Sequence, residues 1–256
     1  FKSMSFTSVA NTPQPSLAWQ FEGSTTDYIT GLSPTTITGT PTYVTGKYGQ
    51  AIQFTNSAGS TASQRLAYST SLSSASGFTY SFWVQFNTYN VGFQTPISLG
   101  DASSYLNIYG TSVIYLYWLR GTNAIQASSS FSYSIGTWYH IVVTYVSQTV
   151  TLYINGISTT GILYISGVPS GTNVGADTTF TTLYAGSQNT SLAFNGLIDD
   201  LRIYNTALNS TQINNIYQMG GISSILSLTL TQKIPIDTSP NPLNLQSYTT
   251  NIQKSS

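Results

Sequence analysis

The chain has 256 residues, enough to bury a sizeable core, and it has no cysteine, so neither disulfide bonds nor zinc–thiolate sites stabilise it. Charged residues make up only 5% of the sequence, and seven Lys or Arg balance seven Asp or Glu. A surface with so few charges has no long-range field to attract phosphate groups or anionic lipid, which excludes nucleic acid as an expected partner.

Segments in which apolar and polar residues alternate, separated by turn-forming residues, recur along the chain and predict β-strands. The predicted strands are residues 17–22, 51–54, 78–86, 105–109, 113–119, 138–146, 150–155, 183–186 and 197–204. The alternation assigns to the core Phe78, Tyr80, Phe82 and Val84 on one strand, and Val150, Leu152 and Ile154 on another. No apolar run approaches the 18 or so residues that span a bilayer, so no membrane insertion is expected.

One segment, residues 209–219, carries the signals of a helix instead. Asn209 is a suitable N-cap, and Gln212, three residues later, completes a capping box. Ile213 and Ile216 share one face of the helix that would follow. The sequence therefore predicts an all-β protein with a single short helix near residues 209–219.

The two ends of the chain differ from this central pattern. Residues 1–15 contain two prolines and are predicted to form an N-terminal arm ahead of a domain at 16–219. In residues 220–256, a strand-like stretch at 222–232 precedes a Pro-containing segment without apolar periodicity, which predicts an extended arm. An arm of this kind can pair with a neighbouring copy, so a homo-oligomer formed through it is one predicted arrangement.

Six segments, in their order and spacing, resemble the LamG-like jelly-roll domain of the concanavalin A-like lectin and glucanase superfamily. They are LAWQFEG (17–23), GKYGQAIQF (46–54), FTYSFWV (78–84), GTWYHIVVTY (136–145), VTLYING (150–156) and FNGLIDDLRIYNTALNSTQINNIY (194–217). The resemblance covers roughly residues 16–219 and implies a two-sheet antiparallel β-sandwich. It also implies that the terminal segments meet at one edge and that loops at the rim carry any binding site.

The few carboxylates in the sequence argue against a catalytic site. Glycoside hydrolysis needs two carboxyl groups about 5 to 9 Å apart, yet Glu22 is the only Glu and no E-x-D-x-x-E stretch occurs. Asp199 and Asp200 are adjacent in a predicted strand, so their side chains are expected on opposite faces and not around one glycosidic bond. His140 is the only histidine, lies mid-strand without a nucleophile elbow, and is expected to be structural. The sequence predicts no enzyme.

A calcium site is implied by the resemblance, because many domains of that family hold the ion near the junction of the first and last core strands. Glu22 and Asp27 follow the first predicted strand, and Asp199 or Asp200 would point toward them if the two strands are neighbours. Carboxylate oxygens of these four residues are the expected calcium ligands. The alternative is that one aspartate pairs with Arg202 or caps a turn while the other binds backbone amides.

A carbohydrate-binding face is predicted on the strands at 105–109 and 113–119. If a three-residue loop at 110–112 joins them, one face holds Tyr105, Asn107, Tyr109, Tyr115 and Tyr117, and the other holds Leu106, Ile108, Ile114 and Leu116. The second set is the expected core. Tyrosine rings flanked by amide groups suit the stacking and hydrogen bonding of sugar rings. The alternatives are a hydrogen-bonded outer sheet surface and a contact with another subunit.

Two functions follow from these features. The first is a non-catalytic, lectin-like carbohydrate-binding module on an extracellular or virion surface. The second is a structural or assembly protein of a surface layer, filament or viral capsid, and the expected partners are accordingly glycans or neighbouring subunits. The sequons at Asn189 and Asn209 are predicted glycosylation sites if a eukaryotic secretory pathway, or a virus that uses one, makes the protein.

Overall fold

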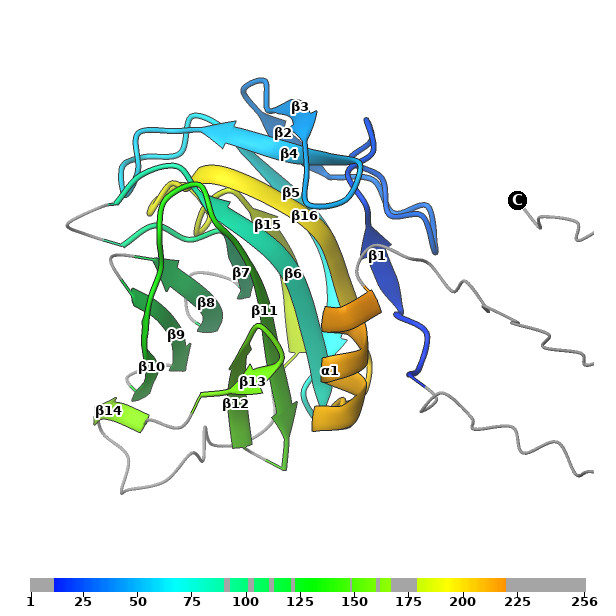
Figure 1. Ribbon diagram of the computed structural model, residues 1–256, viewed down its shortest axis with the longest axis vertical. Helices are drawn as coiled ribbons and strands as arrows, with labels where there is room; N and C mark the ends of the chain where they lie inside the picture. Colours follow the sequence, from blue (N-terminus) through cyan, green and yellow to red (C-terminus); the bar gives the residue numbers. More distant parts are fainter. Residues whose placement is uncertain are drawn as a thin grey trace, which may run out of the picture. The chain divides into compact units, whose positions relative to one another are not determined.

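The computed structural model describes residues 12–89, 93–100, 104–110, 113–120, 123–147, 149–159, 162–166 and 179–219 (Figure 1). The predicted arm at 220–256 and most of the predicted arm at 1–15 lie outside the described residues. The described chain forms two antiparallel sheets, each with eight strands, and one short helix. This is the all-β sandwich with a single helix that the sequence predicts.

The first sheet, sheet A, has the strand order β13-β12-β11-β6-β16-β4-β3, and β1 pairs with β16. Its strands are β1 (Leu17–Trp19), β3 (Thr42–Thr45), β4 (Gln50–Thr55), β6 (Phe78–Phe86), β11 (Trp138–Val146), β12 (Thr149–Ile154), β13 (Ile157–Ser158) and β16 (Asn195–Tyr204). The pairing of β1 with β16 brings together the first and last strands of the sandwich, which agrees with the meeting of terminal segments that the family resemblance implies.

The second sheet, sheet B, has the strand order β14-β10-β9-β8-β7-β15-β5-β2. Its strands are β2 (Thr36–Thr38), β5 (Arg65–Ser73), β7 (Ile97–Gly100), β8 (Ser104–Gly110), β9 (Val113–Arg120), β10 (Asn123–Ser132), β14 (Ile162–Ser166) and β15 (Thr179–Ala185). Neighbours in the sheet are often far apart in the sequence, since β15 lies between β7 and β5.

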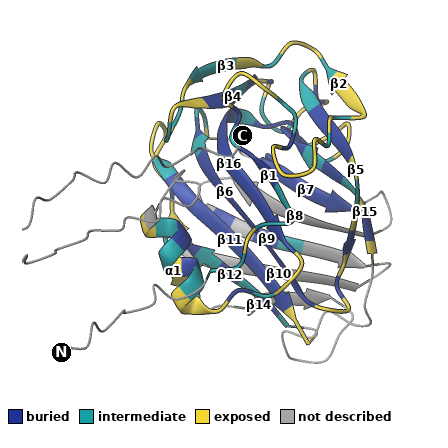
Figure 2. Cartoon of the chain, turned by 90° about the vertical axis from the view of Figure 1, so that its right-hand side faces the viewer, coloured by how far each residue is buried: buried dark blue, intermediate teal, exposed yellow. Residues whose placement is uncertain are grey.

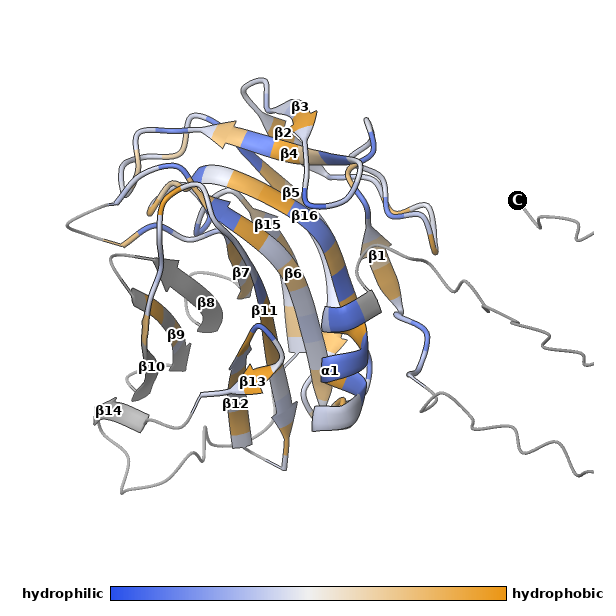
Figure 3. Cartoon of the chain, viewed as in Figure 1, coloured by the Kyte–Doolittle hydropathy of each residue, from blue (hydrophilic) through white to orange (hydrophobic). Residues whose placement is uncertain are grey.

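The core lies between the two sheets and follows the predicted alternation. All seven core residues predicted on β6 and β12 are buried: Phe78, Tyr80, Phe82, Val84, Val150, Leu152 and Ile154. Aromatic rings stack within this core, with the Phe78 and Tyr145 centroids 5.6 Å apart. Figure 2 shows the buried residues along β6, β11 and β16, and Figure 3 shows polar and apolar bands alternating along β16. These strands therefore bury every second side chain, as the alternation in the sequence predicts.

The helix α1 (Ser210–Met219) begins as the sequence predicts. The Asn209 amide donates to Gln212 Oε1 at 2.9 Å, and the Gln212 amide donates to Asn209 Oδ1 at 3.0 Å, which is a reciprocal capping box. Ile213 and Ile216 pack on the outer face of sheet A, beside Val142 of β11. Within the described ranges, no helix has the length and apolar character needed to cross a membrane.

Replacing Asn209 with alanine is expected to lower the free energy of unfolding by about 1 kcal/mol, because the helix loses the acceptor for its Gln212 amide. Urea unfolding of the purified chain measures this change. Asn214→Ala, at an exposed position inside the same helix, is the control and is expected not to destabilise the protein. Equal stabilities of the two variants would show that the cap contributes nothing.

Strand β16 contains a β-bulge that no sequence pattern predicts. The pairing with β6 shifts by one residue between Asp199 and Arg202, and Asp200 has a φ of 47°, in the left-handed region. Ile198 and Leu201 therefore both lie in the core although they are three residues apart. Asp199 and Asp200 both turn away from the core, so the prediction that they point to opposite faces is wrong.

Candidate functional site

Asp27 lies in a turn that packs against β1 and is only 1% exposed. Its carboxylate accepts hydrogen bonds from the amides of Ala18 (2.5 Å), Ile29 (3.1 Å) and Thr30 (2.7 Å), and from the Thr30 hydroxyl (2.7 Å). Burial raises the pKa of the Asp27 carboxyl, but these hydrogen bonds together lower it below its ordinary value. Asp27 is thus an ionised acceptor that fixes the turn to the strand.

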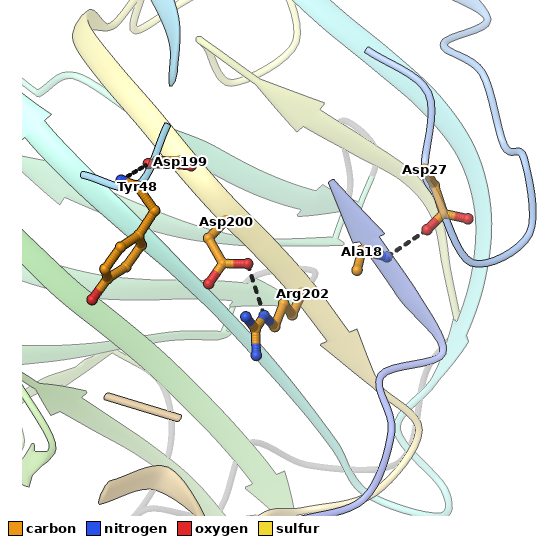
Figure 4. Close-up of polar contacts among 6 residues, drawn as sticks. All are labelled: Ala18, Asp27, Tyr48, Asp199, Asp200 and Arg202. Atoms are coloured by element: carbon orange, nitrogen blue, oxygen red, sulfur yellow. Dashed lines mark hydrogen bonds and ion pairs between the residues drawn. The ribbon is translucent and has the colours of Figure 1, made fainter. Parts of the chain in front are cut away.

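Glu22 and Asp199 both bind the chain between β3 and the start of β4. The Gln50 amide donates to Glu22 at 3.0 and 3.1 Å, and the Tyr48 amide donates to Asp199 Oδ2 at 2.9 Å (Figure 4). A side chain at Gly46 would place its Cβ only 2.7 Å from Asp199 Oδ2, so the loop needs glycine there. Asp199 therefore holds the loop, and Glu22 holds the first residue of β4, each through a backbone amide.

Asp200 forms an ion pair with Arg202, with 2.8 Å between Oδ1 and Nε, and both residues are buried (Figure 4). Burial is the largest single influence and lowers the pKa of the Arg202 guanidinium, but the charges and hydrogen bonds of Asp200 and Tyr204 together raise it above its ordinary value. Burial raises the pKa of the neighbouring Asp199 carboxyl to about 7, although the Tyr48 amide lowers it. These groups form a buried polar cluster on the outer face of sheet A.

The four acidic residues do not fit the calcium site that the resemblance implies. Among the described residues, no three His, Cys, Asp or Glu side chains gather as a group that could hold a metal ion. Asp27 and Asp199 accept backbone N–H groups where a cation would need free oxygen atoms, and Asp200 is paired with Arg202. The contacts are those of the alternative interpretation, an aspartate–arginine pair and amide-bound aspartate. Calcium binding by the protein stays a prediction.

His140 lies in β11 within a stack of rings on the outer face of sheet A. Its ring centroid is 5.0 Å from that of Trp83 and 5.8 Å from that of Tyr217 on α1. Burial, together with the nearby Arg202 charge, lowers the pKa of His140 to about 3, so the ring is neutral near pH 7. The residue packs the helix against the sheet, which is the structural role expected of it.

The predicted tyrosine face lies on sheet B. Tyr109 pairs with Tyr115 and Asn107 pairs with Tyr117, and directly opposed residues in antiparallel strands share a face. The five predicted residues, Tyr105, Asn107, Tyr109, Tyr115 and Tyr117, are therefore on the same face of β8 and β9. Ile114 and Leu116 alternate with them and are 0% and 1% exposed. The strand register thus separates a tyrosine face from the core as the sequence predicts. The predicted loop at 110–112 is wrong, however, because Gly110 belongs to β8 and pairs with Ile114; the shift keeps the same residues on each face.

This face continues across sheet B as a single row of paired residues. From β5 to β14 the row is Ala67, Tyr184, Ser98, Asn107, Tyr117, Gln126 and Tyr164. Adjacent strands are about 4.8 Å apart, so the row extends about 24 Å from Tyr184 to Tyr164. Aromatic and amide residues follow one another along most of it. In the described part of the chain, the only helix lies on the other sheet.

Three residues of this row have no signal in the local sequence: Tyr184, Gln126 and Tyr164. Residues 123–132 have little apolar alternation and so are not predicted as a strand, although they form β10. Tyr184 belongs to a predicted strand, but its place beside Ser98 depends on the pairing of β15 with β7. Because that pairing joins segments far apart in the sequence, no local pattern indicates it.

Both sequons lie at exposed positions. Asn189 Oδ1 accepts a hydrogen bond from Arg65 Nη1 at 2.8 Å, and Asn209 caps α1. A glycan on either residue would compete with that side-chain contact, and glycosylation stays a prediction.

Proteins of different activities share the jelly-roll sandwich. The fold and the face of tyrosine and amide residues therefore identify a class of β-sandwich proteins and not a single activity. The sequence from residue 54 to residue 214, more than half of the chain, matches the family described as the concanavalin A-like lectin/glucanases superfamily. The chain belongs to this family, which confirms the resemblance carried by the six sequence segments. Comparison with curated protein sequences finds no match.

Several solved structures share the fold. Domain 4 of AbnA, an extracellular arabinanase from Geobacillus stearothermophilus solved with arabinotriose, is 21% identical with a TM-score of 0.61, over 80% of this chain and 98% of that one. The binding domain of paraclostridial mosquitocidal protein 1 is 18% identical with a TM-score of 0.60, over 80% and 51%. A botulinum neurotoxin type C structure, whose cell entry depends on two ganglioside molecules, is 16% identical with a TM-score of 0.57, over 79% and 50%. This chain therefore spans about half the length of the two toxin chains.

Proposed function

We propose that this chain is a non-catalytic carbohydrate-binding module that acts on an extracellular, cell or virion surface. It belongs to a family of lectins and glucanases, and similar structures include a domain solved with arabinotriose and a toxin that depends on gangliosides. The binding surface is the outer face of sheet B. The observation that carries the proposal is the row of paired residues from Tyr184 to Tyr164.

The chemistry of this row suits a neutral, extended oligosaccharide. Tyrosine rings stack on the apolar faces of sugar rings, and the amides of Asn107 and Gln126 can bond to ring hydroxyls. The row is about 24 Å long, the length of a linear chain of several sugars lying across the strands, and Ser98 within it is 1% exposed. The row itself carries no charged residue, and in the described part of the chain the charge beside it is the Arg65 guanidinium, 5.8 Å from the Tyr184 ring centroid at one end, so an uncharged glycan is the favoured ligand along the rest of the row.

A binding role, rather than hydrolysis, is supported by the places of the carboxylates. Of the four described acids, Glu22 and Asp27 follow β1, and Asp199 and Asp200 lie in β16 of sheet A; none lies in the row on sheet B. Each of them accepts backbone amides or pairs with Arg202. Asp101, Asp177 and Asp237 lie outside the described residues.

The test is binding of the purified chain to an array of neutral oligosaccharides that includes arabinotriose. Wild type is expected to bind, and Tyr117→Ala or Tyr184→Ala is expected to weaken binding about tenfold, the loss of one stacked ring. Tyr28→Ala, an exposed tyrosine next to β1, is the control and is expected to bind as wild type does. Repeating the measurement with chelator tests whether calcium contributes.

Two results would overturn this proposal: no binding to any oligosaccharide, or binding that neither row variant weakens. Thermal melts of each variant establish that it is folded. The alternative function, a structural or assembly protein, rests on residues 220–256, which lie outside the described residues.

A further inference from the structure

Aromatic rings gather around Trp83 of β6 on the outer face of sheet A. Trp83 pairs with His140 of β11 on one side and with Asp199 of β16 on the other. Directly opposed residues in antiparallel strands share a face, so all three side chains lie on the outer face. Tyr217 of α1 stacks on the indole, with 5.7 Å between the ring centroids. Trp83 is thus a central ring that three strands and the helix surround.

The loop that joins β3 to β4 adds a further aromatic ring to this group. The Tyr48 ring meets the Trp83 ring edge-on, with 5.7 Å between the centroids, while Asp199 Oδ2 accepts the Tyr48 amide at 2.9 Å. Burial raises the pKa of the Tyr48 hydroxyl, and the charges of Asp200 and Asp199 raise it further, so both carboxyl groups lie within electrostatic reach of it (Figure 4). We call the rings of Trp83 and Tyr48 the aromatic corner.

The Lys47 ammonium group lies against the aromatic corner. Its Nζ is 4.5 Å from the Trp83 ring centroid and 5.8 Å from that of Tyr48, both within the range of cation–π attraction. Lys47 forms no ion pair with a carboxylate in the described part of the chain, so the two rings are the partners of its ammonium group. Trp83 is only 3% exposed, whereas Lys47 is exposed and can turn away into water. The chain's own alkylammonium group therefore marks a cation position that another cation can take when Lys47 leaves it.

We propose that the aromatic corner is a binding site for an organic cation, an alkylammonium or methylated ammonium group, and that Lys47 is an internal competitor for this site. The inference goes beyond the proposed function, since it concerns the other sheet and another class of ligand. Aromatic faces attract organic ammonium groups, whereas a calcium ion needs about six to eight oxygen ligands, which the rings cannot supply. Arg202, the other cation near Tyr48, is paired with Asp200, which offsets its charge.

The test titrates the isotope-labelled chain with tetramethylammonium chloride and follows the indole N–H signal of Trp83 by NMR. This signal is assigned as the one missing from the Trp83→Phe variant. Tetramethylammonium is expected to shift it in a saturable manner, whereas tert-butanol, an uncharged molecule of similar shape, and sodium chloride at equal ionic strength are expected not to. Butylammonium chloride and Nα-acetyl-lysine methylamide are titrated alongside. Binding of either supports the site, and the tighter of the two shows whether a free amine or a lysine within a protein chain fits it better.

Substitutions at the aromatic corner are expected to change the affinity in opposite directions. Lys47→Ala is expected to bind tetramethylammonium about threefold more tightly than wild type, because the internal competitor is gone. Tyr48→Ala is expected to weaken binding about threefold, whereas Tyr48→Phe keeps the ring and is expected to retain most of the binding. Both Tyr48 variants keep the backbone amide that Asp199 binds. Tyr28→Ala, an exposed tyrosine outside the corner, is the control and is expected to bind as wild type does.

Any of three results would overturn the inference. They are the absence of a saturable shift in both wild type and Lys47→Ala, an equal response to tert-butanol, and weaker binding by Lys47→Ala than by wild type. Thermal melts establish that each variant is folded. The row on sheet B is measured separately by the oligosaccharide array and contains none of the residues of the aromatic corner, so the failure of one proposal leaves the other in place.

Discussion

Replacing Phe82 with alanine is expected to lower the free energy of unfolding by about 3 to 5 kcal/mol, a large part of the stability of an ordinary domain. Phe82 is fully buried on β6, which lies between β11 and β16 at the centre of sheet A. Its ring stacks on Tyr80 with centroids 6.2 Å apart. Truncation removes this apolar contact and leaves a cavity that strands on both sides prevent from collapsing. Urea unfolding at neutral pH measures the loss.

The matched control is Ile157→Ala on β13, at the edge of the same sheet. Ile157 is 75% exposed, so its truncation is expected to change the free energy of unfolding by about 0.5 kcal/mol or less. Phe82→Leu fills most of the volume and is expected to fall between the two. Similar losses for Phe82→Ala and Ile157→Ala would contradict the assignment of Phe82 to the core.

The features that the sequence predicts correctly are those with a local cause. Core positions on β6 and β12 recur every second residue because one face of each strand is buried, and the structure confirms them. The capping box of α1 needs only Asn209 and Gln212, three residues apart, so its prediction does not depend on the rest of the fold. The tyrosine face on β8 and β9 follows from one short connection and the parity of two strands.

The predictions that failed depend on backbone geometry or on distant partners. Asp200 adopts a positive φ inside a strand, which a non-glycine residue does rarely and without a sequence signal, and the resulting bulge turns both aspartates to one side. The sequence correctly places the first and last strands together, but Asp27 bonds to the Ala18 amide on β1 instead of facing β16. Backbone N–H groups bind Asp27 and Asp199, and Arg202 pairs with Asp200, contacts that no local pattern indicates; calcium binding stays a prediction.

The exposure of aromatic residues at the strand ends also depends on partners that are distant in the sequence. Tyr89 and Phe131 lie at or beyond the ends of strands, where no alternation assigns a side chain to the core or the surface. Their exposure follows from contacts between the loop after β6 and the loop after β10, which are about forty residues apart. Tyr89 bonds to the Tyr133 carbonyl, and Gln94 bonds to the Thr88 carbonyl. Only the assembled structure identifies which aromatic residues remain accessible.

The second large effect expected is on the pH dependence of stability, in the variant Asp199→Asn. Burial raises the pKa of Asp199 to about 7, with a further increase from the Asp200 charge, whereas an aspartate in the unfolded chain titrates near 3.9. The contribution of Asp199 to stability is therefore fully present below about pH 4 and is lost as the pH rises to about 7. The shift corresponds to roughly 4 kcal/mol. Asparagine does not ionise, and its amide oxygen can still accept the Tyr48 amide, so the variant lacks this loss.

His140, on the same face of sheet A, acts in the opposite direction. Burial lowers its pKa to about 3, so its contribution is present above about pH 6.5 and is lost as the pH falls. Between about pH 4 and pH 6.5 the two slopes oppose each other in the wild-type protein. In Asp199→Asn only the slope of His140 remains, and stability is expected to rise with pH across this interval.

Urea unfolding of wild type and Asp199→Asn at intervals from pH 4 to pH 8 measures the difference. The free energy of unfolding of the variant is expected to increase relative to that of wild type as the pH rises, and the variant is expected to be the more stable protein at pH 8. At that pH the wild-type protein holds Asp199 and Asp200 as adjacent buried charges, with Arg202 as their close cation. Glu22→Gln removes one exposed carboxylate that binds the first residue of β4, and it controls for the loss of a negative charge. Parallel curves for wild type and Asp199→Asn would mean that Asp199 is ionised at its ordinary pKa, which requires water to reach it beneath the Tyr48 loop.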